Sequence, residues 1–136
     1  MKVKIKKLHK NAVIPKYAKP GDAGLDLTSV SSTMKGHHVT YHTGLAVEIP
    51  AGYVGLLFPR SSVYKTHQML SNCVGVIDSG YRGEIMMKFT CSRDQYVDGC
   101  KIGQLIIMPY PEIEFEEVEK LSDSDRGSGG FGSTGV

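Results

Sequence analysis

Hydrophobic and polar residues alternate along much of the chain, with the period of two that is typical of half-exposed β-strands. Alternation is clearest in residues 2–8, 45–49 and 84–89, and short apolar runs occupy residues 53–58, 74–77 and 102–108. Segments with a helical period are scarce, and we expect one short helix, capped by Ser61 or Ser62 and extending to about Met69. Together with 16 glycines and no Trp, this pattern predicts an all-β domain.

The stretch from residue 74 to residue 89 combines two of these strands with polar residues between them. An apolar run ends at Asp78, and a turn containing Gly80, Tyr81 and Gly83 leads into the next strand. We interpret it as a β-hairpin whose glycines allow unusual backbone conformations and whose tip presents Asp78 and Tyr81 beside exposed main-chain amides. An Asp in this position can act on water or bind a hydroxyl, or it can simply satisfy its own turn.

Polar side chains also stand at other strand ends. Arg60, Ser61 and Ser62 follow an apolar strand, and paired guanidinium donors with serine hydroxyls can bind phosphate. Asp26 lies between two leucines and is either a solvated carboxylate or one that faces a cation or a metal-bound water. Gln104 lies among apolar residues, so its amide must be hydrogen-bonded, either as a structural bridge or to a ligand.

Three further segments carry weaker signals. Residues 2–8 present lysines on one face and residues 112–116 present glutamates, so we expect these two strands to pair, within a chain or between chains. Residues 29–36 and 92–100 are interpreted as loops, and His37, His38 and His42 as polar surface rather than a metal site.

The last fifteen residues are rich in glycine and serine, which predicts a tail that is mobile when nothing is bound. Arg126 and Phe131 are unusual in an inert spacer, because successive glycine amides and an arginine can hold an oxyanion while an aromatic ring covers a flat one. Pro109 and Pro111 can stiffen the exit toward this segment. We therefore divide the chain into a domain (residues 1–121) and a flexible C-terminal arm (residues 122–136).

Composition narrows the class of protein. The 136 residues suffice for one domain, and 16 basic against 14 acidic residues leave no electrostatic footprint for duplex nucleic acid. No apolar run approaches the length of a membrane span, and the first residues do not resemble a secretion signal. Three cysteines without a CxxC pair fit free thiols. We expect a protein of the cytoplasm, or of the nucleus or host-cell interior if it is viral, that binds neither nucleic acid nor membrane.

Taken together, these groups resemble the five ordered motifs of the trimeric deoxyuridine triphosphatases (dUTP pyrophosphatases, dUTPases). The matching segments are, in order, residues 23–27, 59–62, 72–83, 99–105 and 126–135. Two of them depart from the usual pattern: Cys100, Lys101 and Gly103 stand where the family usually carries Asp, Arg and Ala, and Cys73 and Val74 where many members have Ala and Pro.

The resemblance implies a distorted jelly-roll of the β-clip type and a homotrimer with three active sites, each shared by three subunits. It also implies that the C-terminal arm is exchanged between subunits and closes over a neighbouring site. The expected reaction is Mg²⁺-assisted attack of water on the α-phosphorus of dUTP, which gives dUMP and pyrophosphate, keeps uracil out of DNA and supplies dUMP for thymidylate synthesis. Two alternatives remain: a dCTP deaminase of the same fold, and a nucleotide-binding module without catalysis.

The resemblance also assigns roles to single residues. Asp78 would hold the attacking water and the 3′-hydroxyl, Tyr81 would lie under the deoxyribose, and Asp26 would orient a water on Mg²⁺, which is otherwise held by substrate phosphates. Ser61 is grouped with Asp78 and Asp26 as catalytic. The remaining contacts are the uracil-reading residues Asn72, Val76, Ile77 and Met86, the phosphate-binding residues Arg60, Ser61, Ser62 and Gln104, and the arm residues Arg126, Phe131, Gly132, Ser133 and Thr134, with Phe131 over the uracil and Arg126 on the γ-phosphate.

Overall fold

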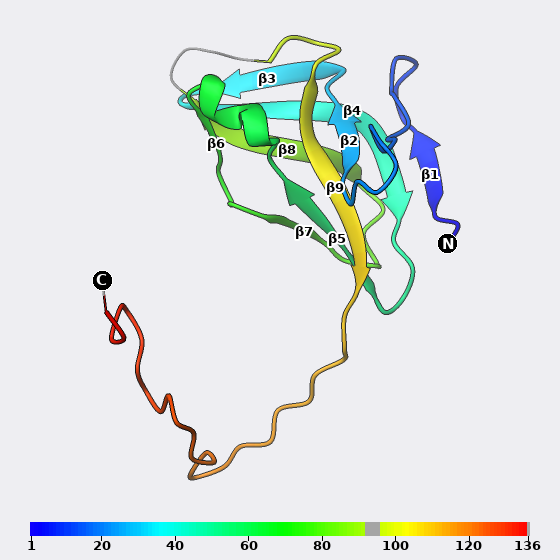
Figure 1. Cartoon of the computed structure of the whole chain (residues 1–136). Helices are drawn as coiled ribbons and strands as arrows, with labels where there is room; N and C mark the ends of the chain where they lie inside the picture. Colours follow the sequence, from blue (N-terminus) through cyan, green and yellow to red (C-terminus); the bar gives the residue numbers. More distant parts are fainter. Residues whose placement is uncertain (92–95, 136) are drawn as a thin grey trace.

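The computed structural model describes residues 1–91 and 96–135, and these residues form an all-β body followed by an extended C-terminal segment (Figure 1). The strands pair in antiparallel fashion, and the predicted all-β class is confirmed. In chain order they are β1 (Lys4–Lys7), β2 (Leu25–Thr28), β3 (Ser31–Lys35), β4 (His38–Glu48), β5 (Tyr53–Phe58), β6 (Gln68–Leu70), β7 (Gly75–Ile77), β8 (Glu84–Cys91) and β9 (Lys101–Pro109), with one 3₁₀ helix, η1 (Ser61–Lys65), after β5.

Two sheets enclose the core. One has the order β1-β4-β8-β6, with β3 also paired to β4, and the other has the order β2-β9-β5-β7. Side chains at alternate positions of both sheets pack between them. Within the first sheet, Tyr41 of β4 and Phe89 of β8 make an edge-to-face ring contact with centroids 5.5 Å apart. The buried cluster comprises Leu27, Val39, Tyr41, Val47, Ile49, Leu57, Leu70, Ile77, Ile85, Met87, Phe89, Ile102 and Leu105.

The predicted hairpin between residues 74 and 89 is wrong. β7 pairs with β5, and β8 pairs with β4 and β6, so the two strands belong to different sheets and the turn between them is an arch. Neither Gly80 nor Gly83 has a positive φ. A hairpin would have joined the two strand edges, whereas the arch leaves them apart.

Two local predictions also differ from the structure. Residues 31–35 form β3 instead of a loop; every residue of β3 is exposed, so hydrophobic alternation could not reveal it. The helix ends at Lys65 instead of near Met69, because the next residues enter β6, where Gln68 and Leu70 are buried. Its N-cap is Arg60, and no side chain caps it, so neither serine has the expected role.

The N-terminal strand pairs with β4, and Lys4 Nζ lies 3.6 Å from a Glu48 carboxylate oxygen. Residues 112–116 form no strand, so the expected pairing with the first strand is wrong within the chain and remains a prediction between chains. Residues 110–135 lead away from the body without regular strands or helices (Figure 1).

Several other expectations concern parts of the chain with little regular structure. Of the loop expected at residues 92–100, residues 92–95 lie outside the described residues, and Tyr96 packs against the core. Position 136 is also outside them. Cys73 and Cys100 are free thiols. Among the described residues, no helix is long and apolar enough to cross a bilayer.

Candidate active site

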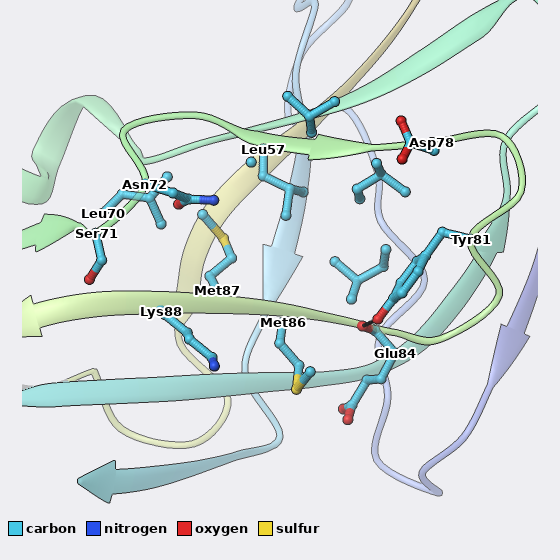
Figure 2. A pocket seen from close by; sticks show the side chains of 14 residues that line it. Leu57, Leu70, Ser71, Asn72, Asp78, Tyr81, Glu84, Met86, Met87 and Lys88 are labelled. Carbon is cyan, nitrogen blue, oxygen red and sulfur yellow. Dashed lines mark hydrogen bonds between the residues drawn. The ribbon is translucent and has the colours of Figure 1, made fainter.

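A pocket of about 430 Å³ opens between β7 and β8, where the arch holds the two sheets apart (Figure 2). Its walls come from both strands, from the turn that joins them and from the segment after β6. The residues that line it are Leu57, Leu70, Ser71, Asn72, Gly75, Val76, Ile77, Asp78, Tyr81, Glu84, Ile85, Met86, Met87 and Lys88.

Both walls of the pocket are strand edges. β7 is the last strand of its sheet, and β6 pairs with β8 only from Phe89 onward. The carbonyl of Lys88 accepts a hydrogen bond from the Ser71 amide (2.9 Å), and the carbonyl of Glu84 accepts one from the Tyr81 hydroxyl (2.9 Å). Since main-chain groups point to the same side at every second residue of a strand, the N–H and C=O of Met86 also face the pocket. They can pair with the edge of a flat ligand.

Asp78 and Tyr81 lie at the end of the pocket nearest the turn (Figure 2). The turn is closed by the main-chain bond from the Tyr81 amide to the Asp78 carbonyl (3.1 Å), and no described residue hydrogen-bonds to the exposed Asp78 carboxylate. That carboxylate is therefore available to a ligand. The Tyr81 ring extends toward the start of β8, and a Cβ at Gly83 would come within 2.4 Å of its hydroxyl. Gly83 is thus needed for close contact with the ring.

Arg82 braces this turn, a role that the sequence did not indicate. Its Nη1 donates to the carbonyls of Ser79 (2.6 Å) and Tyr81 (3.0 Å), and its Nη2 lies 3.6 Å from Glu48 of β4. Sequence reasoning also missed Ser71, Glu84 and Lys88 as lining residues. The position of Lys88, on an exposed face of a strand that borders the turn, was the only available signal.

The expected phosphate-binding residues lie elsewhere in the same chain. Among the described residues, Arg60, Ser61, Ser62, Asp26 and Gln104 do not line this pocket. Nor do the arm residues, of which Phe131 is fully exposed. Within one chain, the structure therefore brings together the expected base, sugar and water contacts and not the expected phosphate contacts.

Asp26 and Gln104 are partners across the β2–β9 pairing, and each side chain has a partner within the chain. Asp26 faces a cation, because Lys101 Nζ lies 2.5 Å from its carboxylate. Gln104 forms a bridge within the chain, since its Nε2 donates to the Pro59 carbonyl (3.1 Å) directly before Arg60. A Cβ at Gly24 would overlap the Gln104 amide, so this glycine makes room for the bridge.

No group of three or more His, Cys, Asp or Glu side chains in the described part of the chain could hold a metal ion. His42, expected to be polar surface, is instead half-buried against Glu84. A divalent cation would have to take most of its oxygen ligands from water or from a bound phosphate, as Mg²⁺ commonly does.

Comparison with known proteins assigns a family to this arrangement. A family model described as dUTPase matches residues 10–135. A deoxyuridine 5′-triphosphate nucleotidohydrolase of Gloeothece citriformis is 41% identical over 100% of this chain and 98% of its own length. The enzyme of that name from Cutibacterium acnes is 45% identical over 90% of this chain and 86% of its own length.

Solved structures agree. The Staphylococcus bacteriophage 80alpha dUTPase with dUpNHpp is 31% identical, with a TM-score of 0.86 over 99% of both chains. A mutant dUTPase of Staphylococcus aureus phage phi11, whose structure describes the coordination of a structural Mg(II) ion, is 26% identical, with a TM-score of 0.75 over 88% of this chain and 98% of that one. The all-β fold, predicted to be a jelly-roll, is confirmed by these neighbours, and the chain belongs to the dUTPase family.

Proposed function

We propose that this chain hydrolyses dUTP to dUMP and pyrophosphate, with the pocket between β7 and β8 as the nucleoside site. The observation that carries the proposal is the pair of unjoined strand edges around this pocket. At one end lie a fixed tyrosine and the Asp78 carboxylate, to which no residue of the described part of the chain hydrogen-bonds. Family membership supplies the substrate class. Such an enzyme would keep uracil out of DNA and supply dUMP inside the cell, in the cytoplasm or, for a viral protein, in the host cell.

Uracil fits a pocket that is bordered by main-chain groups. Its O2, N3–H and O4 present acceptor, donor and acceptor along one edge, and the N–H and C=O of Met86 with the Asn72 side chain and the main chain at Val76 and Ile77 offer complements. Cytosine would leave at least one buried polar group unmatched, at a cost of about 1–3 kcal/mol. This difference in binding free energy would favour uracil over cytosine.

Tyr81 and Asp78 would act on the sugar and on water. The Tyr81 ring is held by its bond to the Glu84 carbonyl and by contact with Gly83, so a flat surface would lie under the deoxyribose, where a 2′-hydroxyl would clash. The Asp78 carboxylate, to which no described residue hydrogen-bonds, would hold the 3′-hydroxyl and the attacking water, and would accept the proton of that water as it attacks the α-phosphorus.

The phosphate contacts would come from other subunits. Arg60, Ser61 and Ser62 do not line the pocket of their own chain, as expected for the homotrimer that the family resemblance implies, in which each site combines segments of three chains. Arg60 would supply paired donors, with Ser61 and Ser62 beside it. Gln104 would support this segment through Pro59 while lying near the phosphates.

The arm would complete each site. Gly132, Ser133 and Thr134 would contact the phosphates, Arg126 would neutralise the γ-phosphate, and Phe131, exposed in the free chain, would cover the uracil. Positioning and charge neutralisation of this kind are most of what phosphoryl transfer requires.

Mg²⁺ fits the donor chemistry only in part. Asp26 offers a carboxylate, but Lys101 already contacts it, so Asp26 would act on the ion through a water while substrate phosphates supply direct ligands. When bound, the ion would neutralise charge on the phosphate oxygens.

Pyrophosphate release from dUTP, dCTP, dTTP and UTP, measured with Mg²⁺ and with EDTA, tests the proposal. We expect dUTP to be hydrolysed far faster than the other three and EDTA to abolish most of the activity. Ammonia release from dCTP would instead support a deaminase. Tight dUTP binding without turnover would support a binding module.

A further inference from the structure

Glu84 connects the pocket to β4, because its main chain borders the pocket and its side chain contacts β4. Its main-chain carbonyl faces the pocket and accepts a hydrogen bond from the Tyr81 hydroxyl, while its side chain is directed away from the Tyr81 ring (Figure 2). The position of the Tyr81 ring therefore depends on where the chain places residue 84.

The Glu84 carboxylate reaches an irregularity in β4. The β4–β8 register shifts between His42 and Ala46, and Gly44, with φ of +65°, lies within the shifted segment. One carboxylate oxygen of Glu84 accepts a hydrogen bond from the Gly44 amide (2.8 Å), and the other lies 3.1 Å from His42 Nδ1. A bulge leaves main-chain groups without ladder partners, and Glu84 satisfies one of them.

His42 extends the connection. Its Nε2 lies 3.3 Å from the Thr33 hydroxyl of β3, so both ring nitrogens have partners. The side chains of His42 and Glu84 are only 27% and 25% exposed, so both are more confined than a typical surface pair. Such a pair can fix geometry even where it adds little to stability.

The space around Tyr81 makes its position sensitive to this connection. Gly83 has no room for a Cβ because the Tyr81 ring lies against it, and the ring hydroxyl bonds to the next residue. Movement of residues 83 and 84 toward or away from β4 would therefore move the ring with them. The ring lines the pocket, so its depth determines the space left beside a bound sugar.

We propose that Glu84, held by His42 and the Gly44 amide, is a positioning residue that sets the depth of Tyr81 and thereby the discrimination between deoxyribose and ribose nucleotides. This inference rests on the proposed function for the assignment of the sugar subsite to Tyr81. It assigns no contact with the substrate to Glu84 or His42 side chains.

The test uses Glu84→Ala, Glu84→Gln and His42→Gln in the full chain, with His38→Gln as the matched control. His38 is an exposed histidine of the same strand, four residues away from His42. The readouts are kcat/KM for dUTP and UTP, the affinities for dUDP and UDP by calorimetry, and the thermal midpoint.

We expect Glu84→Ala to reduce the preference for the deoxynucleotide about tenfold, the effect of about one lost hydrogen bond, mainly through better acceptance of UTP. Glu84→Gln keeps an acceptor for the Gly44 amide and should retain most of the preference. His42→Gln should reduce it by a smaller factor, and His38→Gln should leave it unchanged.

A lower thermal midpoint with an unchanged preference in both Glu84→Ala and His42→Gln would overturn the inference, because it would reveal a purely structural role. If Glu84→Ala does not fold, His42→Gln alone decides, because an unchanged preference with a lower thermal midpoint in that variant would overturn the inference. If the wild-type protein binds dUDP in preference to UDP but releases no pyrophosphate from dUTP, the proposed reaction is refuted. The affinities of the variants for dUDP and UDP then still test the role of Glu84. A wild-type protein without that preference would overturn the inference.

Discussion

At the scale of single residues, the arch turn determines which side chains are free to react. Asp78 has no hydrogen-bond partner for its carboxylate among the described residues, since the turn is closed by main-chain groups and by Arg82. An Asp that satisfied its own turn would have been unavailable. The structure therefore supports the interpretation of Asp78 as a group that acts on a ligand, which the sequence left open.

Asp78→Asn should bind dUTP with near-normal affinity and lose turnover about 10²- to 10⁴-fold, because the amide cannot accept a proton from water. Calorimetry with dUTP and pyrophosphate release measure the two effects separately. Asp22→Asn is the control, since Asp22 is an exposed carboxylate in another turn, bonded to the Lys19 amide. Turnover within a few-fold of wild type for Asp78→Asn would refute the catalytic role.

At the scale of strands, the sequence predicted where strands lie along the chain better than it predicted which strands pair with each other. The strands β1, β5, β7, β8 and β9 and the second half of β4 lie where hydrophobic alternation or apolar runs indicated them. Strand β3 was missed because it is fully exposed, and β6 because three residues are too few to show a period. The arch was mistaken for a hairpin because pairing of β7 with β5 and of β8 with β4 is decided by residues distant in sequence.

The same distinction applies to the site. The motifs indicated Asn72, Asp78, Tyr81 and Met86, all of which line the pocket. The braces Arg82 and Glu84 could not be identified, because their partners Glu48 and His42 lie 34 and 42 residues earlier and become neighbours only through the β4–β8 pairing.

Strand β9 contains a glycine where the family motif usually has alanine, and the packing around it gives a reason. A Cβ at Gly103 would lie 2.4 Å from Met87 Sδ and 2.9 Å from the Phe58 carbonyl oxygen. The methionine can move, but the main chain of β5 cannot move without cost. Gly103 and Met87 therefore compensate for each other in this chain.

Gly103→Ala should lower the free energy of unfolding by about 1–3 kcal/mol through overpacking. Adding Met87→Val should recover part of the loss, because it removes the thioether but leaves the Phe58 carbonyl in place. Urea unfolding of both single variants and of the double variant measures the coupling. Gly80→Ala, at a position with open space and no positive φ, should change stability by no more than about 0.5 kcal/mol. An unaffected Gly103→Ala would contradict this account of the packing.

At the scale of the whole molecule, the nucleoside pocket and the expected phosphate contacts are separate in one chain. The pocket lies between β7 and β8, Arg60 stands at the end of β5, and the arm extends away from the body (Figure 1). Among the described residues, the hydrogen bonds of the arm lie within it, as from the Gly129 amide to the Arg126 carbonyl (3.1 Å). The body therefore does not depend on the arm for its own packing.

Deletion of residues 126–136 should leave the thermal midpoint nearly unchanged and lower kcat/KM for dUTP roughly 10²-fold or more. The deletion removes Arg126, which would neutralise the γ-phosphate, and Phe131, which would cover the base. A chain that ends at Thr134 controls for shortening alone. Mixing decides whether the arm acts on its own chain or on a neighbour. Chains with Asp78→Asn keep a complete arm, and truncated chains keep Asp78, so assemblies refolded from both would regain working sites only if arms are exchanged. Activity of the mixture no greater than that of the two inactive proteins measured separately would contradict shared sites.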